Sequence, residues 1–430
     1  MRPLCHFMAG KGLVAPPARG RDGTGTWFED IAFLYLIIQC VTLIAAPHKI
    51  MAAVTPVQIG LLCDLSQANE RFGQAAVAGA RAAVGDINGQ DWARQRPLKL
   101  IVSDTQGDPA KLLSQAEDLV KKQGVLVLAG PGDKALSGTL RRCGGKLNVP
   151  VIITEGGAII RYGIERPAPD WTFRVGADLN AEIKALYSGL AQAGLGLIAP
   201  LAQDSDSGKQ SIVFMKAYAT ESGLKTTPSI TFKGEDQGQD LVPQFKKAQR
   251  EGAVAVTAFG IKKTSGPGII NSAKEAGIDV AMPADMLSSE ILKQSQAQPR
   301  LFIVAPPILL GRNLSDRHPC KLSEIRFRLA IGDKINSMSP GELLAAGAAW
   351  DAVNLAALGI KKAQELTPQA IRDALEDLDE PYAGVMGVIK PTKVEHLGPS
   401  PDSLIVVEKK NNALVPIGTN DNLDLPLLPH

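Results

Sequence analysis

The sequence predicts an α/β protein with two doubly wound parallel sheets, and three observations carry that prediction. From residue 54 onward, short continuous apolar runs alternate with amphipathic segments. Charged side chains gather in the loops between them and are scarce in the apolar runs. The alternation starts again after Arg174. Apolar strands joined by helices are typical of a parallel sheet covered on both faces, and 430 residues are enough for two such domains.

The first series of elements opens with a strand and a helix. Val57–Leu62 is an apolar run bounded by Pro and Asp, which predicts a buried strand. Apolar residues recur every three to four positions over Phe72–Ile87, which predicts a helix. Asp108 followed by Pro109 has the pattern of a helix start. The other elements are expected to be strands at Leu98–Val102, Val125–Ala129 and Val149–Ile153 and helices at 110–122 and Ala135–Leu147.

The second series has the same character. Its helices are expected at Asn180–Ala193, Lys209–Ser222, Asp240–Arg250 and Gly266–Ala276, and its strands at Leu195–Ala199, Thr226–Phe232, Ala253–Phe259 and Asp279–Met282. Pro200 is expected to end the first of these strands. Beyond them we expect a strand at Leu301–Val304, helices at Leu343–Ile360 and Pro368–Leu378, a strand pair at Ser403–Glu408 and Leu414–Ile417, and a loose tail at 419–430.

Composition excludes several classes of function. Residues 1–53 hold five of the 46 Lys and Arg residues and three of the 44 Asp and Glu residues, so the remainder carries 41 of each. A neutral body without a basic block argues against nucleic acid as the main partner. The Cys and His residues past position 53 lie at no metal-ligand spacing, so we expect no metal and no cofactor. Cys63, Cys143 and Cys320 are expected to be buried thiols, with a Cys63–Cys143 disulfide as the alternative.

The amino-terminal segment, residues 1–53, predicts export. Ile31–Ala46 is a 16-residue apolar run, which is short for a membrane span but typical of the hydrophobic region of a signal peptide. Glu29 and Asp30 precede it where Lys or Arg is usual. A start codon placed too far upstream explains this, and so does translation from Met51, which would make the protein cytoplasmic. We predict a periplasmic protein that has lost an extension and signal peptide.

One pattern imitates a dinucleotide-binding motif. The strand at 125–129 is followed by Gly130-x-Gly132-x-x-Ala135, and a further strand is followed by Glu155, which suggests glycines for a pyrophosphate and an acid for the ribose. However, the motif falls on the second crossover of the domain, and Asp133 would crowd the phosphates. We therefore favour a glycine turn at a strand–helix junction. No Ser-His-Asp or P-loop pattern offers another catalytic set.

Three segments carry a resemblance to a known family. The run 57–89 (VQIGLLCDLSQANERFGQAAVAGARAAVGDING) resembles the opening of the leucine/isoleucine/valine-binding family, the periplasmic solute receptors of ABC importers with the type I binding fold. DTQGDP at 104–109 with its following helix is similar to that family's second unit. YAGVMGVI at 382–389 with SLIVVE at 403–408 is similar to its closing segment. The resemblance covers about 54–417.

The resemblance implies two lobes joined by three crossing segments, with a ligand between the lobes. It places lobe 1 at 54–175 plus 305–387 and lobe 2 at 176–304 plus 388–418. The crossings are expected near Phe173–Ala177, Phe302–Pro306 and Gly384–Lys390. By position in the family's motifs, the ligand-binding residues are expected to be Phe72, Lys134, Glu155, Gly157, Ser207, Lys262 give or take one, and Asp285.

Several of these residues depart from the family's amino-acid-binding pattern. Only Phe72, Asp285 and a glycine at 208 fit it. Lys134 replaces a carboxylate-binding Ser and can still bind a carboxylate through a charge-assisted hydrogen bond. Glu155 must pair either with Lys134 or with a cationic ligand, because a buried carboxylate needs a partner. The resemblance therefore implies a small polar or zwitterionic ligand, amino-acid-like or amide-like, rather than a branched-chain amino acid.

Three functions remain open at this point. The first is an exported, monomeric solute receptor that passes a small-molecule ligand to a membrane permease, with no enzymatic activity. The second is a cytoplasmic regulator that resembles the amide sensor of amidase operons and requires translation from Met51. The third, less favoured, is a dinucleotide-dependent enzyme that uses Gly130–Ala135 and Glu155.

Overall fold

The computed structural model describes residues 54–66, 69–156, 170–234, 240–295, 299–411 and 413–418. The chain divides into two units, 1–53 and 54–430, and all described residues belong to the second unit. The predicted signal segment, the turn residue Gly157 and the carboxyl-terminal tail lie outside the described residues.

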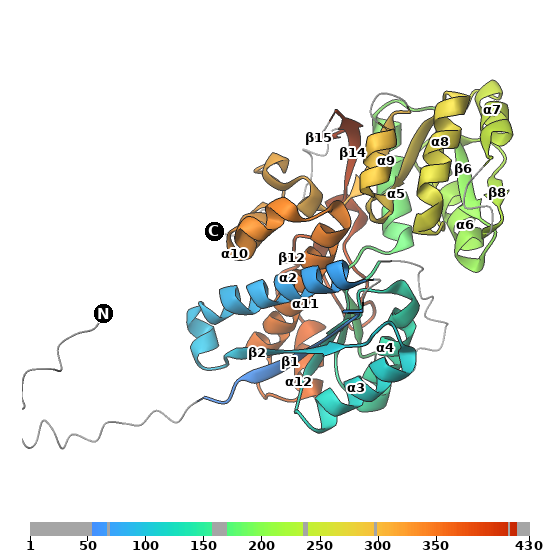
Figure 1. Ribbon diagram of the computed structural model, residues 1–430. Helices are drawn as coiled ribbons and strands as arrows, with labels where there is room; N and C mark the ends of the chain where they lie inside the picture. The colour runs from blue at the N-terminus through green and yellow to red at the C-terminus, as the bar shows by residue number, and fades with distance from the viewer. Residues whose placement is uncertain are drawn as a thin grey trace, which may run out of the picture. The chain divides into compact units, whose positions relative to one another are not determined.

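Five parallel strands form the first sheet, in the order β2, β1, β3, β4 and β5. Figure 1 labels β1 and β2 of this sheet. The strands are β1 (Val57–Cys63), β2 (Leu98–Asp104), β3 (Val127–Gly130), β4 (Val151–Ile153) and β5 (Thr172–Arg174). One face packs against α2 (Glu70–Asn88), α10 (Lys321–Ile331), α11 (Pro340–Lys362) and α12 (Pro368–Leu375). The other face packs against α3 (Pro109–Lys121) and α4 (Lys134–Leu147).

The second sheet has the order β15, β14, β11, β10, β9, β6 and β7, with β8 also paired to β6. Its strands are β6 (Leu197–Gln203), β7 (Lys225–Thr226), β8 (Ile230–Phe232), β9 (Ala255–Ala258), β10 (Asp279–Pro283), β11 (Leu301–Ala305), β14 (Ile405–Lys410) and β15 (Ala413–Pro416). All pair in parallel except β14 and β15, which form the predicted late antiparallel pair. Helices α5 (Leu179–Gln192) and α6 (Asp206–Glu221) cover one face, and α7 (Val242–Arg250), α8 (Gly266–Ala276) and α9 (Ser289–Gln294) cover the other.

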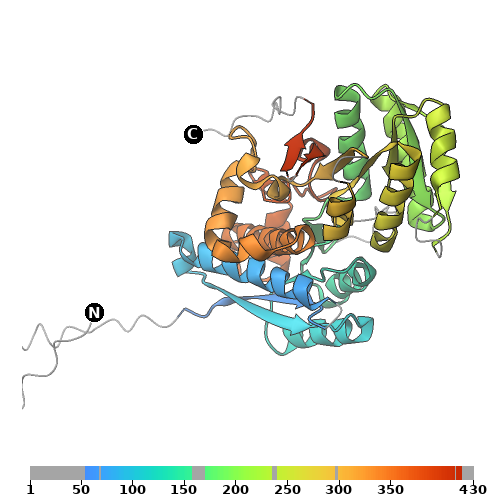
Figure 2. The ribbon, with the colours of Figure 1, turned by 45° about the horizontal axis from the view of Figure 1, so that its top comes forward.

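The chain passes between the two sheets three times. It leaves the first sheet after β5 and enters α5, it leaves the second sheet after β11 and reaches α10 and α11, and it returns through the ribbon β12 (Tyr382–Ala383) and β13 (Val388–Ile389) to β14 (Figure 2). Each sheet with its helices is called a lobe below, the first and the second. The predicted fold class, two doubly wound sheets joined by three crossings, is confirmed.

Local signals in the sequence explain where several helices begin. Asp108 caps α3 by accepting hydrogen bonds from the N–H groups of Ala110 and Lys111, with Pro109 in the first turn as predicted. Ser339 and Glu342 form a capping box at the start of α11. These contacts satisfy N–H groups that a helix leaves without internal partners.

The prediction that Pro200 ends a strand is wrong, because β6 runs through it to Gln203. The carbonyl of Ile198 accepts a hydrogen bond from Thr227 at the end of β7. Pro200 faces the same side, since backbone groups alternate along a strand. On that side of β6 the pairing is interrupted, because β7 ends at Thr226 and β8 begins at Ile230. No carbonyl group opposite Pro200 therefore requires the N–H that proline lacks.

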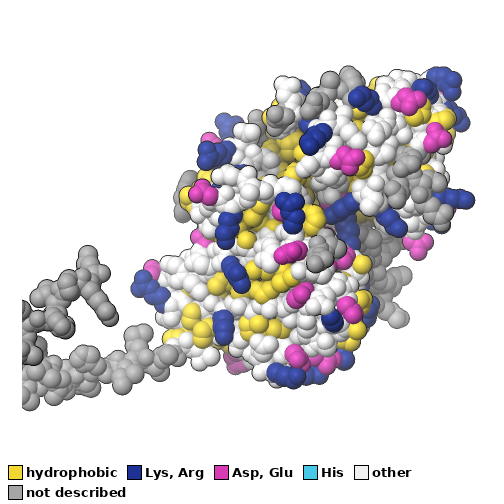
Figure 3. All heavy atoms as spheres, viewed as in Figure 1, with side chains coloured by type: hydrophobic (Ala, Val, Ile, Leu, Met, Phe, Trp, Pro, Cys, Tyr) yellow, Lys and Arg dark blue, Asp and Glu magenta, His cyan; other side chains and the backbone are white. Residues whose placement is uncertain are grey.

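The three cysteines are buried free thiols, as predicted, and the Cys63–Cys143 disulfide is not formed. Among the described residues, α11 is the one helix long and apolar enough to cross a membrane, and 72% of its most apolar window is buried inside the protein. We interpret α11 as a core helix of the first lobe, since it packs along α2 and α12. On the face shown in Figure 3, basic and acidic side chains are interspersed.

Candidate functional site

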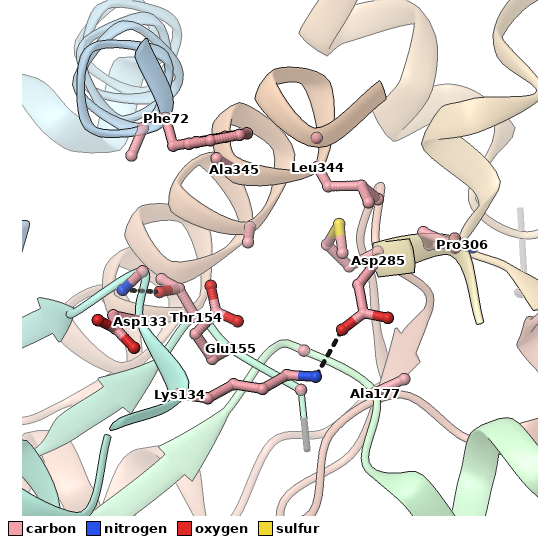
Figure 4. Close-up of a pocket in the computed structure, with 18 of the residues that line it drawn as sticks. Phe72, Asp133, Lys134, Thr154, Glu155, Ala177, Asp285, Pro306, Leu344 and Ala345 are labelled. Atoms are coloured by element: carbon pink, nitrogen blue, oxygen red, sulfur yellow. Dashed lines mark hydrogen bonds and ion pairs between the residues drawn. The ribbon is translucent and has the colours of Figure 1, made fainter. Parts of the chain in front are cut away.

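A cleft of about 380 Å³ is lined by residues of both lobes (Figure 4). The first lobe contributes the loops after β1, β3 and β4 and one side of α11. The second contributes the first turn of α5 and the short turns after β9 and β10. All three crossings reach the cleft, through Ala177, Pro306 and Met386. It therefore lies at the carboxyl ends of the parallel strands, where open α/β sheets bind ligands.

An ion pair joins the two lobes across this cleft. The Nζ atom of Lys134, the first residue of α4, lies 2.5 Å from Oδ2 of Asp285, in the turn Ala284–Met286 after β10. The Asp285 carboxylate raises the pKa of Lys134 against the opposing effect of burial. Burial alone would raise the pKa of Asp285, but Lys134 and Lys263 outweigh it and hold that pKa below its usual value. Both groups therefore stay charged at neutral pH.

Two further carboxylates line the cleft, one from each lobe. Glu155 follows β4 in the first lobe, and Glu182 lies in the first turn of α5 in the second. Among the described residues, neither carboxylate has a hydrogen-bond or ion-pair partner within contact distance. Burial raises the pKa of Glu155 to about 7, and Lys263 and Lys134 only partly offset this effect. Burial, followed by the Asp285 charge, raises the pKa of Glu182 well above its usual value.

Glu155 and Glu182 both line the cleft, where each keeps part of its surface exposed. Glu155 and Glu182 are half-buried by surface area, yet protein atoms surround both of them closely enough for burial to dominate their pKa shifts. A side chain in a cleft can be partly exposed and still have a raised pKa. Water reaches it, but the protein excludes most of the solvent that would stabilise its charge.

The glycine turn at the end of β3 allows close packing of the backbone against β1. A Cβ on Gly130, whose φ is +130°, would lie 2.0 Å from the carbonyl oxygen of Leu62, so only glycine fits. The N–H of Gly132 donates to the Thr154 hydroxyl at 3.1 Å. Asp133 caps α4 through the N–H of Ala135 at 2.7 Å. A carboxylate already occupies the helix terminus that a pyrophosphate would need, which supports the glycine-turn interpretation over a dinucleotide site.

One wall of the cleft is apolar. Leu344, Ala345 and Ala348 of α11 line it, and Phe72 of α2 lies beside them (Figure 4). Phe72 is 46% exposed and is the one aromatic residue among the described residues that line the cleft. The cleft thus combines a small-residue wall with a strongly charged floor.

The structure brings together four of the seven residues predicted from the sequence. Phe72, Lys134, Glu155 and Asp285 line the same cleft. Gly157 lies outside the described residues. Ser207 and Lys262 are exposed and are not among the lining residues, whereas Lys263, one position on, lines the cleft. Whether Ser207 and Lys262 contact a ligand stays a prediction.

Glu182 was not predicted from the sequence, because it lies in a helix that follows a crossing segment and not in a loop after a strand. One signal could have identified Glu182. It is an acidic residue in the first turn of α5, the first helix after a crossing segment. The sequence also left the partner of Glu155 open between Lys134 and a cationic ligand, and the structure pairs Lys134 with Asp285 instead of Glu155. In the described part of the chain, no group of His, Cys, Asp and Glu residues has the geometry to hold a metal ion.

A family model described as periplasmic binding protein matches residues 56–410. The chain belongs to the periplasmic binding protein family. The resemblance to the leucine/isoleucine/valine-binding proteins is thereby confirmed. Proteins of this family are solute-binding receptors rather than enzymes.

Solved structures share the fold of this periplasmic binding protein at low sequence identity. An extracellular ligand-binding receptor from Rhodopseudomonas palustris HaA2 is 18% identical with a TM-score of 0.65, over 84% of this chain and 100% of the receptor. A putative branched-chain amino acid ABC transporter from Rhodospirillum rubrum is 18% identical with a TM-score of 0.66, over 84% and 100%. A branched-chain amino acid transporter substrate binding protein from Streptococcus pneumoniae, in complex with isoleucine, is 18% identical with a TM-score of 0.63, over 85% and 100%.

Part of the periplasmic binding protein also matches larger plant proteins. Glutamate receptor 1.2 of Arabidopsis thaliana is 24% identical over 195 residues, and Glutamate receptor 1.1 is 23% identical over 192 residues. Each match covers 44% of this chain but only 22% and 23% of the respective receptor, so the shared part is a small fraction of those proteins.

Proposed function

We propose that this protein is the extracytoplasmic solute-binding component of an ABC importer, and that it binds a small polar or zwitterionic ligand in the cleft between its lobes. The observation that carries the proposal is the cleft itself. It is lined by both lobes and all three crossings, and charged groups face each other across it. A membrane permease is the proposed partner that receives the ligand.

Binding in such a cleft is coupled to closure of the lobes. A ligand that contacts both lobes only in the closed arrangement shifts the population toward that arrangement. We propose Phe72, Lys134, Glu155 and Asp285 as ligand contacts. The first three come from the first lobe and Asp285 from the second, so the ligand meets apolar, cationic and anionic groups. The charged lysine and carboxylate groups of the cleft make a branched-chain amino acid a poor ligand, since its apolar side chain would leave charges desolvated and unpaired.

Export is supported by the apolar run Ile31–Ala46, which has the length of a signal-peptide hydrophobic region. The family of the chain supports an extracytoplasmic location as well.

Fractionation combined with mass spectrometry tests this proposal. The protein is expressed in a bacterium from its own full reading frame, the periplasmic and cytosolic fractions are separated, and both are analysed by native and denaturing mass spectrometry. We expect a periplasmic protein that has lost about fifty residues and retains a small polar molecule. A cytosolic protein that begins at Met51 would overturn export and favour the regulator, and a bound dinucleotide would overturn the receptor function.

A further inference from the structure

We propose that the ligand is a small organic cation, an amine or an amidine, and that its cationic group binds between Glu155 and Glu182. This inference rests on the proposed function, because it concerns the same cleft, and it names the class of solute. The two carboxylates come from opposite lobes and both line the cleft. A cation in contact with both would therefore hold the lobes together.

The acid that faces the cleft from the second lobe near β10 is already neutralised by the protein. Asp285 pairs with Lys134 of the first lobe at 2.5 Å. A ligand ammonium group at Asp285 would have to displace a lysine that is tethered in place, and a ligand carboxylate at Lys134 would have to displace a tethered aspartate. Either exchange breaks one charge-assisted hydrogen bond to form another, so it adds little binding free energy. The charged groups that the protein leaves without an ion-pair partner lie elsewhere in the cleft.

Most of the charged groups that line the cleft are carboxylates. Glu155, Glu182 and Asp285 are three carboxylates, and the lysines that face them are Lys134 and Lys263. Lys134 forms an ion pair with Asp285. Lys263 is exposed and has no ion-pair partner within contact distance among the described residues. Two carboxylates therefore remain without a hydrogen-bonded partner in a site that excludes most of the solvent, and a bound cation would satisfy both.

Other charged groups near the two carboxylates add to the same sign. Asp133, the cap of α4, acts on Glu155, and Asp178, the cap of α5, acts on Glu182. Both are acidic, so with Asp285 three carboxylates act on Glu155 and Glu182, against the two lysines Lys134 and Lys263. An anionic ligand placed there would meet like charges from both lobes, which costs binding free energy.

This arrangement has a measurable consequence for protons. In the empty cleft burial raises the pKa of Glu155 to about 7 and raises the pKa of Glu182 well above its usual value, so both carboxyls are harder to ionise than free ones. A cation that binds between them favours their ionised forms, so binding releases protons and tightens as the pH rises. An anion that binds there would take up protons and bind more tightly as the pH falls.

Isothermal titration calorimetry with defined probes tests the inference. Putrescine and acetamidine are the cationic probes, succinate the anionic probe, acetamide the neutral probe and glycine the zwitterionic probe. Titrations are made on the mature protein at pH 5.5 and pH 8, in buffers of different ionisation enthalpy so that proton release is counted. Aliphatic amines and amidines stay protonated over this range because their own pKa values lie well above it.

We expect a cationic probe to bind most tightly, with an affinity that rises at least about tenfold from pH 5.5 to pH 8 and with net proton release. Glu155→Gln and Glu182→Gln should each weaken binding about tenfold or more and remove part of the pH dependence. Glu365→Gln, an exposed residue of the loop between α11 and α12, is the matched control and should change neither. Melting temperatures establish that all three variants are folded.

Three outcomes would overturn the inference, and they can be told apart from failure of the proposed function. Tightest binding of succinate, acetamide or glycine, or retention of the cation affinity in both glutamine variants, would reject the cationic ligand while leaving a solute receptor. Absence of binding by every probe, together with a native mass that carries a solute without a cationic group, would reject it as well. A periplasmic protein that binds no probe and carries no solute would contradict the proposed function too.

Discussion

The close approach of α2 and α11 predicts opposite effects of one substitution at two positions of the same helix. Gly79 lies where α2 crosses α11, and a Cβ at this position would be 2.0 Å from the carbonyl oxygen and 2.9 Å from the Cα of Ala346. Gly85 lies on the exposed side of α2, and a Cβ there would have no atom within 4 Å. Gly79→Ala should therefore destabilise the protein and Gly85→Ala should stabilise it.

The magnitudes follow from this geometry. Carbon atoms in ordinary contact are about 3.5 Å apart, so the added methyl group at Gly79 must push two buried helices apart by more than an ångström. Overpacking of this kind typically costs about 1–3 kcal/mol, and a clash with backbone atoms cannot be relieved by a side-chain rotation. Replacing Gly by Ala within a helix returns about 1 kcal/mol. We expect a net loss of up to about 2 kcal/mol for Gly79→Ala and a gain of about 0.5–1 kcal/mol for Gly85→Ala.

Denaturation of both variants in urea at pH 7.5 measures the two effects, as shifts of the unfolding midpoint in opposite directions around the wild-type value. Circular dichroism and tryptophan fluorescence should give the same midpoint, since both probes follow the same transition when unfolding is cooperative. Equal midpoints for the two variants, or a Gly79→Ala protein more stable than wild type, would refute the packing argument.

Two more predictions concern charged groups. Burial raises the pKa of Asp351 to about 7, above that of the carboxyl in the unfolded chain. This group therefore stabilises the folded state at low pH, and the contribution is lost as the pH rises through 7. Asp351→Asn should flatten the fall of the unfolding free energy between about pH 4 and 7 in urea titrations, and an unchanged slope would contradict this. The ion pair of Lys134 and Asp285 should give a coupling free energy of about 1 kcal/mol in a double-mutant cycle with Lys134→Met and Asp285→Asn, because the lysine is half exposed. Strictly additive effects on the unfolding free energy would mean that the pair does not join the lobes.

Much of the fold was predictable because strands and helices leave local signals. The apolar run of β1, the spacing of apolar residues in α2 and the Asp108–Pro109 start of α3 are all properties of a few adjacent residues. The course of β6 through Pro200 was not predictable, because it depends on a break in the strand beside it. A local pattern cannot report which neighbour a backbone group will face.

The candidate site was predictable in part for the same reason. Lys134, Glu155 and Asp285 directly follow strands, so their approach to one edge follows from the topology of parallel sheets. The pairing of Lys134 with Asp285, 151 residues away, and the arrival of Glu182 depend on how the crossings place one lobe against the other. No spacing in the sequence encodes that placement.

The most direct test of a ligand shared by both lobes is a crystal structure of the mature protein with the solute that co-purifies from the periplasm. We predict electron density in the cleft that contacts the first lobe at Glu155 or Lys134 and the second lobe at Glu182 or Asp285. A solute bound outside the cleft, or held by residues of one lobe alone, would contradict this account.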